Sequence, residues 1–280
     1  MTTQLSRTSL GIGLRPVHYS EIFAHPPQVD FFEIISENFL TTAPVPRANL
    51  SRILETHPVV LHGVSLNLLG ENDPSTQYLD QVAELCEFTK APYFTDHLCW
   101  TGAHGFAHHD LLPTPYTSEL VDIAAERAQF VQKHVGIPFG IENLSSYIDF
   151  SSSEMNEWEF YNRIIAKADC WAMLDINNIY VSAHNHHFNA LDYIHSINWK
   201  KVLQCHVAGH VLTPNGLIVD THDHEVCDGV WELYQAAWSF GGSFPTLLEW
   251  DGNIPPLQNV VDEVFKARSY QKHVHNVAVS

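Results

Sequence analysis

Short apolar runs alternate with amphipathic segments along the whole chain. Most of the runs are continuously apolar rather than alternating, which is typical of parallel strands that are covered on both faces. The runs are residues 9–14, 30–36, 58–64, 92–98, 138–142, 170–175, 202–207 and 246–250. The pattern therefore predicts eight buried, parallel strands.

The segments between these runs carry apolar residues at helical spacing. In residues 117–135 the apolar side chains form one stripe, and Thr117 or Ser118 can cap the start of the helix. In residues 255–269 a proline pair precedes a second stripe. Weaker helical patterns occupy residues 16–25, 46–56, 76–90, 154–167, 189–196 and 229–240.

Eight strands, each followed by a helix, in 280 residues indicate an α/β protein with a (β/α)8 TIM-barrel fold. An open, doubly wound sheet is the alternative, but GIGLRP lacks the third glycine of the phosphate loop typical of that fold. No linker and no break in composition divides the chain. We therefore predict a single barrel domain over residues 1–270 and a flexible tail over residues 271–280.

The chain carries 32 acidic and 14 basic residues, a formal net charge of −18. This charge opposes non-specific binding to nucleic acid and to anionic membranes. The N-terminus does not resemble a signal peptide, and no apolar run approaches the roughly 20 residues that span a bilayer. We expect a soluble, cytoplasmic protein that binds neither nucleic acid nor membrane.

The five cysteines form no CxxC pair, which argues against a disulfide framework and against a structural zinc site. Each is expected to be a small, buried apolar residue. The 19 histidines are a larger share than usual. Some are expected on the surface, such as His186 and His187, whereas others can ligate a transition metal.

Ionisable side chains stand where six of the predicted strands end, in VVLHG, YFTDH, FGIEN, WAMLD, LQCHV and TLLEW, and a polar stretch, IVDTHDHE, precedes the last. The groups are His62, His97, Glu142, Asp175, His206, Asp220, His222 and Glu249. Burying a lone charge costs several kcal/mol or more, so these strand ends are expected to converge on something that offsets the cost. The carboxyl ends of barrel strands share one face, and a cluster of metal ions there is the simplest explanation.

Taken alone, each of these residues also has a structural explanation. A single strand-end histidine more often makes a structural hydrogen bond than binds a metal. Glu142 can cap a turn, and Asp175 can form an Asx turn with a following asparagine. Asp220 and His222, in a D-x-H pattern, lie on the same side of an extended segment, where they can bind one ion or belong to a surface turn.

Four histidines and four carboxylates exceed the roughly three protein ligands of a catalytic zinc or of a 2-His-1-carboxylate iron site. The set suits two metal ions, or three if a carboxylate such as Glu142 bridges them. Mixed imidazole and carboxylate ligation favours iron, manganese or zinc over calcium or magnesium.

Two further residues are candidates for contact with substrate. Asn178 can supply an amide oxygen to a metal or to substrate, or it can be a turn residue. His210, four residues beyond His206, can donate a proton to bound substrate or be an ordinary loop histidine. His108 and His109, in a long loop expected after the fourth strand, are weaker candidates.

Ordered blocks from about residue 10 to residue 268 resemble one family. The blocks are GIGLRPVHY, FFEIISENF, LHGVSL, DHLCW, DLLPTPYT, IENLSSYI, LDINNIYVSAHN, HVAGH, VDTHD and LLEWD. They resemble the multinuclear non-haem iron-dependent oxidases, the group that contains the oxidase of methanobactin biosynthesis. The likeness is greater to the general bacterial branch of this family than to the methanobactin enzyme.

The resemblance implies a barrel with two or three irons, in mixed ferrous and ferric states, that uses dioxygen to oxidise cysteine residues of a ribosomally made peptide. Members form heterocycles from cysteine or excise its β-carbon. The family's ligand pattern falls on the eight strand-end and D-x-H residues named above. The resemblance also implies a separate small protein that recognises the leader peptide and forms a heterodimer with the enzyme. The run LHGVSLNLLGEND departs from a shorter, glycine-rich run that is common in relatives, so the product stays open.

Two other functions fit the same residues. A redox-inert divalent-metal hydrolase or isomerase, of the zinc endonuclease or xylose isomerase type, uses similar His, Asp and Glu strand ends. A metal-buffering protein or scaffold would instead close every coordination position. The sequence does not name the peptide, the product, the partner or the oligomeric state.

Overall fold

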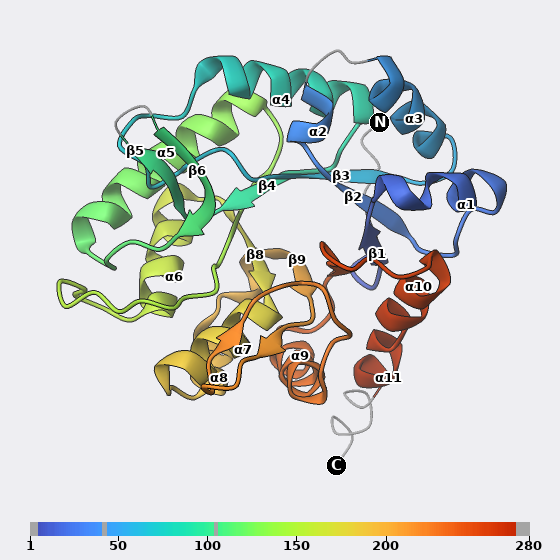
Figure 1. Ribbon diagram of the computed structural model, residues 1–280. Coiled ribbons are helices and arrows are strands. Elements are labelled where there is room, and N and C mark those ends of the chain that lie inside the picture. Colours follow the sequence, from blue (N-terminus) through green and yellow to red (C-terminus); the bar gives the residue numbers. More distant parts are fainter. Residues whose placement is uncertain (1–4, 41–43, 104–105, 273–280) are drawn as a thin grey trace.

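The computed structural model describes residues 5–40, 44–103 and 106–272. Parallel strands close into a barrel in chain order, and helices surround it (Figure 1). The barrel strands are β1 (Leu10–Gly13), β2 (Phe31–Ile35), β3 (Val59–Gly63), β4 (Phe94–His97), β7 (Phe139–Glu142), β8 (Trp171–Asp175), β9 (Val202–Val207) and β12 (Thr246–Leu248). Each lies within a predicted apolar run, and the closed barrel confirms the predicted fold and the single domain.

Most helices begin and end close to the predicted boundaries. These are η1 (Pro16–His18), α1 (Tyr19–Ala24), α3 (Pro44–Leu54), α4 (Thr76–Thr89), α5 (Ser118–Val135), α6 (Glu157–Ala168), α8 (Ala190–Ser196) and α9 (Asp228–Gly241), whereas η2 (Trp199–Lys201), α10 (Leu257–Phe265) and α11 (Ala267–Lys272) depart from the predicted ranges. Thr117 caps α5 as predicted, because its side chain accepts a hydrogen bond from the amide of Leu120. No helix in the described part of the chain is long and apolar enough to cross a membrane.

The structure contains helices and hairpins that the sequence pattern did not predict. They are α2 (Glu37–Leu40), α7 (Ile176–His186), the hairpin of β5 (Trp100–Ala103) and β6 (Phe106–Leu112), and the hairpin of β10 (Val211–Leu212) and β11 (Ile218–Val219). The long loop predicted around His108 and His109 is therefore wrong, since both residues lie on β6. Asparagine and β-branched residues lower the helix propensity of α7, but its cap by Asp175 and its buried face outweigh this.

The C-terminal end also differs from the prediction. The single helix expected over residues 255–269 is wrong, because α10 ends at Phe265 and α11 begins at Ala267. The predicted start of the tail at residue 271 is wrong as well: Gln271 is a buried residue of α11 and donates a 2.8 Å hydrogen bond to the hydroxyl of Tyr234. The rest of the predicted tail, residues 273–280, lies outside the described residues.

Side chains of two kinds fill the interior of the barrel. A lower, apolar cluster occupies the amino-terminal half of the strands and consists of Phe31, Val60, Tyr93, Met173, Leu203 and Leu247. Gly11 makes room for this layer, since a Cβ atom there would lie 2.5 Å from the ring of Phe31. Because side chains on a strand repeat every second residue, the next inward positions form an upper layer nearer the carboxyl ends. That layer is polar and includes Glu33, His62 and Asp175, all buried.

Candidate metal centre

The register of the barrel brings the predicted strand-end residues to one level. His97 pairs with Glu142 across β4 and β7, and Asp175 pairs with His206 across β8 and β9. Glu249 follows β12, where its amide donates a 3.0 Å hydrogen bond to the carbonyl of Val207. A pocket of about 230 Å³ opens here, and its polar lining is His62, His97, Glu142, Ser145, Asn178, Asp220, Thr221, His222, Glu249 and Asp251.

A first group of potential ligands consists of His62, His97 and Glu142. The carboxylate atom Oε2 of Glu142 lies 3.3 Å from Nε2 of His62 and 3.1 Å from Nε2 of His97. All three side chains are buried. Their facing atoms lie close enough together to bind one ion.

A second group lies deeper and consists of Glu142, Asp175, His206 and Glu249. The Nδ1 atom of His206 lies 3.6 Å from Oε1 of Glu142 and 3.2 Å from Oε2 of Glu249. One ligand atom from each of the four residues lies within 4.8 Å of the others. Since Glu142 belongs to both groups through different oxygens, it is placed to bridge two ions.

A third group consists of His222, Glu249 and Asp251. The Nδ1 atom of His222 lies 3.3 Å from Glu249 and 3.4 Å from Asp251, and its Nε2 atom lies 2.6 Å from Oδ1 of Asp220. The extended segment predicted for the D-x-H pair is wrong, because His222 has a left-handed φ of 46°. This turn, rather than an extended strand, brings the two side chains into contact.

Asp251 is the one member of these groups that sequence reasoning missed. It follows Glu249 by two residues in LLEWD, so the same spacing that singled out Asp220 and His222 could have found it. Its carboxylate also forms an ion pair with Arg15, which follows β1. The residue was missed because it lies beyond the end of the last strand.

Each of three imidazoles has a partner on the ring nitrogen that faces away from the shared ligand groups. Nδ1 of His62 lies 2.8 Å from the hydroxyl of Thr95, and Nδ1 of His97 lies 3.1 Å from the carbonyl of Gly63. Nε2 of His206 lies 3.0 Å from a carboxylate oxygen of Glu33. With these acceptors the rings of His62 and His97 carry their proton on the outer nitrogen, and their inner nitrogens keep a lone pair for a metal.

Several polar atoms at the centre are buried without a hydrogen-bond partner. They are Nε2 of His62, Oε2 of Glu142, Oδ2 of Asp175, Oδ1 of Asn178 and Nδ1 of His206. Each such atom costs about 1–3 kcal/mol when it stays unsatisfied, so a cluster of them indicates a missing binding partner. When deprotonated, all of these atoms can donate a lone pair, and imidazole nitrogens mixed with carboxylate oxygens are ligands of transition metals. The residues present therefore fit a metal cluster.

Burial changes the charge state of the metal-free centre. It raises the pKa of Glu142 well above its usual value and that of Asp175 to about 6, and it lowers the pKa of His97 to about 4. His206 behaves differently: burial opposes its protonation, but Glu33, Glu142 and Glu249 outweigh burial and raise its pKa. A bound cation would replace these protons and offset the free-energy cost of burying charged carboxylates.

The structure separates the two residues predicted to contact substrate. Asn178 lines the pocket, and its amide nitrogen donates to the carbonyl of Asn143, which leaves its oxygen facing inward. His210 does not line the pocket. Its Nδ1 atom lies 2.7 Å from the side-chain oxygen of Asn177, whose amide nitrogen donates in turn to Asp220 at 2.7 Å.

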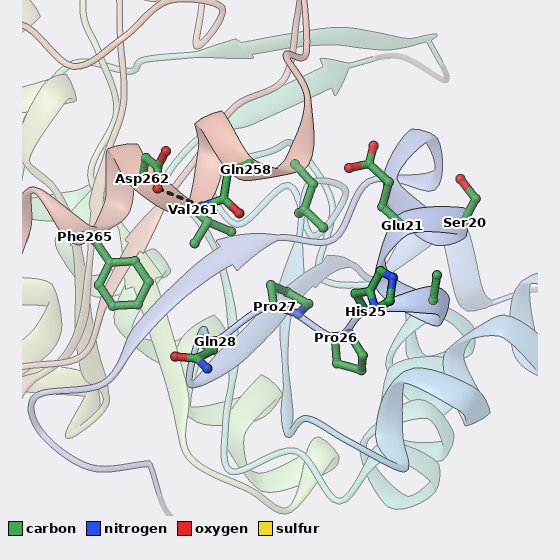
Figure 2. Close-up of a pocket in the computed structure, with 12 residues that line it drawn as sticks. Ser20, Glu21, His25, Pro26, Pro27, Gln28, Gln258, Val261, Asp262 and Phe265 are labelled. Atoms are coloured by element: carbon green, nitrogen blue, oxygen red, sulfur yellow. Dashed lines mark hydrogen bonds between the residues drawn. The ribbon is translucent and has the colours of Figure 1, made fainter.

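A larger pocket of about 670 Å³ lies on the outer flank of the barrel, between α1 and α10 (Figure 2). Pro26, Pro27 and Phe265 supply much of its apolar lining, and Glu21 and Asp262 stand at its edge. None of the metal-ligating groups found among the described residues lies there. The chemistry that the sequence predicts is therefore at the strand ends and not in the larger cavity.

The fold and the site together define a TIM-barrel protein with a candidate multinuclear metal centre. The chain belongs to the family described as RiPP precursor modification enzyme MbnB/TglH/ChrH, whose model matches residues 9–272. RiPPs are ribosomally synthesised and post-translationally modified peptides. This match confirms the family resemblance stated from the sequence blocks.

Two relatives are similar over most of their length. The UPF0276 protein of Rhizorhabdus wittichii is 42% identical over 266 residues, which cover 94% of this chain and 95% of the relative. The UPF0276 protein of Caulobacter vibrioides is 40% identical over 260 residues, 92% of each chain.

Solved structures of sugar epimerases share the fold. A D-tagatose 3-epimerase-like protein matches with a TM-score of 0.66 and 15% identity, over 97% of this chain and 100% of that chain. The 3-keto-D-glucoside 4-epimerase YcjR of E. coli matches with a TM-score of 0.59 and 15% identity, over 94% and 99%. At such low identity the likeness shows the fold alone.

Proposed function

We propose that this chain is a multinuclear iron- and dioxygen-dependent oxidase that modifies cysteine residues of a ribosomally synthesised precursor peptide. One observation carries the proposal: unsatisfied lone-pair atoms on His62, His206, Glu142 and Asp175 converge at the mouth of a barrel of the precursor-modifying family. The same mixture of ligands also suits manganese or zinc, so the family match, rather than the ligand types, favours an oxidase over an isomerase.

The three ligand groups support two or three ions. Glu142 is common to the first and second groups, and Glu249 is common to the second and third. Asp220 holds His222 from the side of Nε2, so it acts either as a ligand or as the partner that orients this ring. Iron bound at these residues would bind the substrate thiolate and dioxygen and would supply the redox chemistry.

The protein's own part is to place the cysteine and to keep water out. The pocket also has an apolar lining, made by Ile35, Val64, Leu111 and Leu144, which suits a cysteine side chain and disfavours bulk water. The inward oxygen of Asn178 accepts a hydrogen bond from a peptide amide. These contacts hold the reacting carbon beside the metal groups, so that the reaction depends on position as well as on the metal.

The pocket of about 230 Å³ has room for a side chain and not for the rest of a precursor peptide. The proposal also assigns recognition of the leader segment to a separate small protein that forms a heterodimer with the chain, as the family resemblance implies. Co-purification of the two proteins, with and without peptide, tests this assignment. A chain that modifies a leaderless peptide as fast as the complete precursor would contradict it.

The decisive experiment uses protein purified without oxygen and loaded with ferrous iron. We expect two or three irons per chain, consumption of dioxygen when a cysteine-containing precursor is added, and a mass change confined to a cysteine of the peptide. The Glu142→Ala variant, which removes the residue shared by two ligand groups, is the matched control and should do none of these. Zinc or magnesium as the resident metal, with no uptake of dioxygen, would instead indicate a hydrolase or isomerase.

A further inference from the structure

Cys227 differs from the other cysteines in its surroundings. Cys86, Cys99, Cys170 and Cys205 are buried, whereas Cys227 is partly exposed. Burial raises the pKa of Cys86 and Cys170 to about 12 and that of Cys99 and Cys205 well above the usual value, so these four thiols stay protonated. Reactivity toward reagents in solution is therefore expected at Cys227 alone.

A histidine stands beside this thiol and is held by a third side chain. Nε2 of His210 lies 3.8 Å from the sulfur of Cys227. Nδ1 of the same ring lies 2.7 Å from Oδ1 of Asn177, a pure acceptor, so Nδ1 carries the proton. Nε2 is then the unprotonated nitrogen, and it faces the thiol. A nucleophile, a base and a group that orients the base are the arrangement of an activated cysteine.

The neighbouring elements support the same interpretation. Cys227 is the N-cap of the 14-residue helix α9 and uses no side-chain capping bond, so its sulfur is available beside the positive end of the helix. The ring of Tyr180 stacks on His210 at 5.2 Å. Gly229 makes room for this tyrosine, since a Cβ atom there would lie 2.7 Å from its ring. The histidine is thus fixed in the position from which it can accept the thiol proton.

The cluster is separate from the metal centre but connected to it. Asn177, which holds His210, donates its amide nitrogen to Asp220 at 2.7 Å, and Asp220 lines the metal pocket. Neither Cys227 nor His210 lines that pocket. Two side chains therefore separate the thiol from the candidate ligands.

We propose that Cys227, with His210 as its base, is a site of thiol–disulfide exchange with small disulfides. The thiol proton passes to Nε2 of His210, and the thiolate attacks one sulfur of the disulfide. That S–S bond breaks, a mixed disulfide forms on Cys227, and the second sulfur leaves as a thiolate that is protonated. Cys227 is oxidised by the disulfide, which is itself reduced, so no other oxidant is needed.

The test uses the folded, metal-free, full-length protein and 5,5′-dithiobis(2-nitrobenzoic acid) as the disulfide. We expect one adduct per chain, located at Cys227 by peptide mass mapping, and none in the Cys227→Ser variant. The His210→Gln variant should react about tenfold more slowly or worse, because it lacks the base. His184→Gln is the matched control, since this histidine bonds the carbonyl of Gly216 and not Cys227.

A second measurement does not depend on any variant. The rate at native Cys227 is compared with the mean rate of the five cysteines in the urea-unfolded chain at the same pH. An activated thiol reacts faster than an unfolded one. A slower native rate, an adduct on a buried cysteine, or equal rates for wild type and His210→Gln would overturn the proposal. None of these outcomes involves iron or peptide, so they leave the proposed oxidase activity to its own test.

Discussion

The lower and upper layers inside the barrel come from the same strands, yet they differ in almost every physical property. In the lower layer Met173 and Leu247 are fully buried and belong to one apolar cluster. Two residues further along the chain, Asp175 at the end of β8 and Glu249 just after β12 take the next inward positions. Moving two residues along a strand therefore changes the inward side chains from a packed apolar core to a cluster of potential ligands.

The comparison shows that the side chains that stabilise the fold and those that form the candidate site occupy different layers of one barrel. The lower layer gains free energy from apolar burial at about 25 cal/mol per Å². The upper layer costs free energy in the metal-free protein, because carboxylates and imidazoles are buried without enough partners. The apolar layer holds in place the strands on which the polar layer depends.

The largest expected effect is the loss of Glu142 from the upper layer. In Glu142→Ala two ligand groups lose their shared carboxylate, so iron content should fall and peptide modification should drop by about a hundredfold or more. Metal analysis and mass spectrometry of the peptide measure these changes. Glu21→Gln, on the flank pocket, is the control and should keep both. Full iron content in Glu142→Ala would contradict the assignment.

Removing a large side chain from the lower layer should affect stability instead. Leu247→Ala leaves a cavity in the apolar cluster and should lower the free energy of unfolding by about 2–5 kcal/mol, as measured by denaturant titration. The metal affinity of the folded protein should stay close to that of wild type. Glu142→Gln should give the opposite pattern. Its free energy of unfolding, measured without metal, should change little, whereas its affinity for metal should fall. A similar loss of stability in both variants would contradict the conclusion that the lower layer stabilises the fold and the upper layer binds metal.

The stability of the metal-free protein should depend on pH because the upper layer contains buried ionisable groups. The pKa of Asp175 is raised from 3.8 to about 6 in the folded state. Between these values the folded state binds more protons, so its stability falls as pH rises from about 4 to about 6, by about 3 kcal/mol. Asp175→Asn keeps the helix cap and should lack this fall. Denaturant titrations of both proteins at several pH values measure the difference.

His97 provides the control of opposite sign. Its pKa is lowered to about 4 from 6.5, so its contribution to stability is present above about pH 6.5 and is lost as pH falls toward 4. The stability of wild type relative to His97→Gln should therefore rise with pH over this range. Parallel curves for the two proteins would mean that His97 is as accessible to protons when folded as when unfolded.

The smallest effect concerns the boundary between the layers, where Glu33 holds the outer nitrogen of His206. Glu33→Gln cannot fix the ring as well, and metal affinity should fall by about 10- to 100-fold. Competition with a chelator of known affinity measures this. Glu21→Gln, on the flank pocket, is the control and should leave the metal affinity unchanged. Unchanged metal affinity in Glu33→Gln would show that Glu33 does not orient the ring of His206 for metal binding.

Sequence reasoning found most of the upper layer for a physical reason. Ionisable residues at the ends of apolar strands are costly unless they converge, and that cost is visible in the order of residues alone. It missed Asp251, which lies past the last strand, and α7, in which residues of low helix propensity form a helix because Asp175 caps it. It could not place His210, whose contacts with Asn177 and Cys227 join three separate elements.

The sequence by itself determined the barrel, because the continuous apolar runs and the helical stripes admit few other ways of burying their surface. It also determined which residue types stand at the strand ends. Only the tertiary structure decided which of them lie close enough together to share an ion, since closure of the barrel sets the register that pairs His97 with Glu142 and Asp175 with His206. Distances between residues far apart in the chain depend on that closure, and no local pattern encodes them.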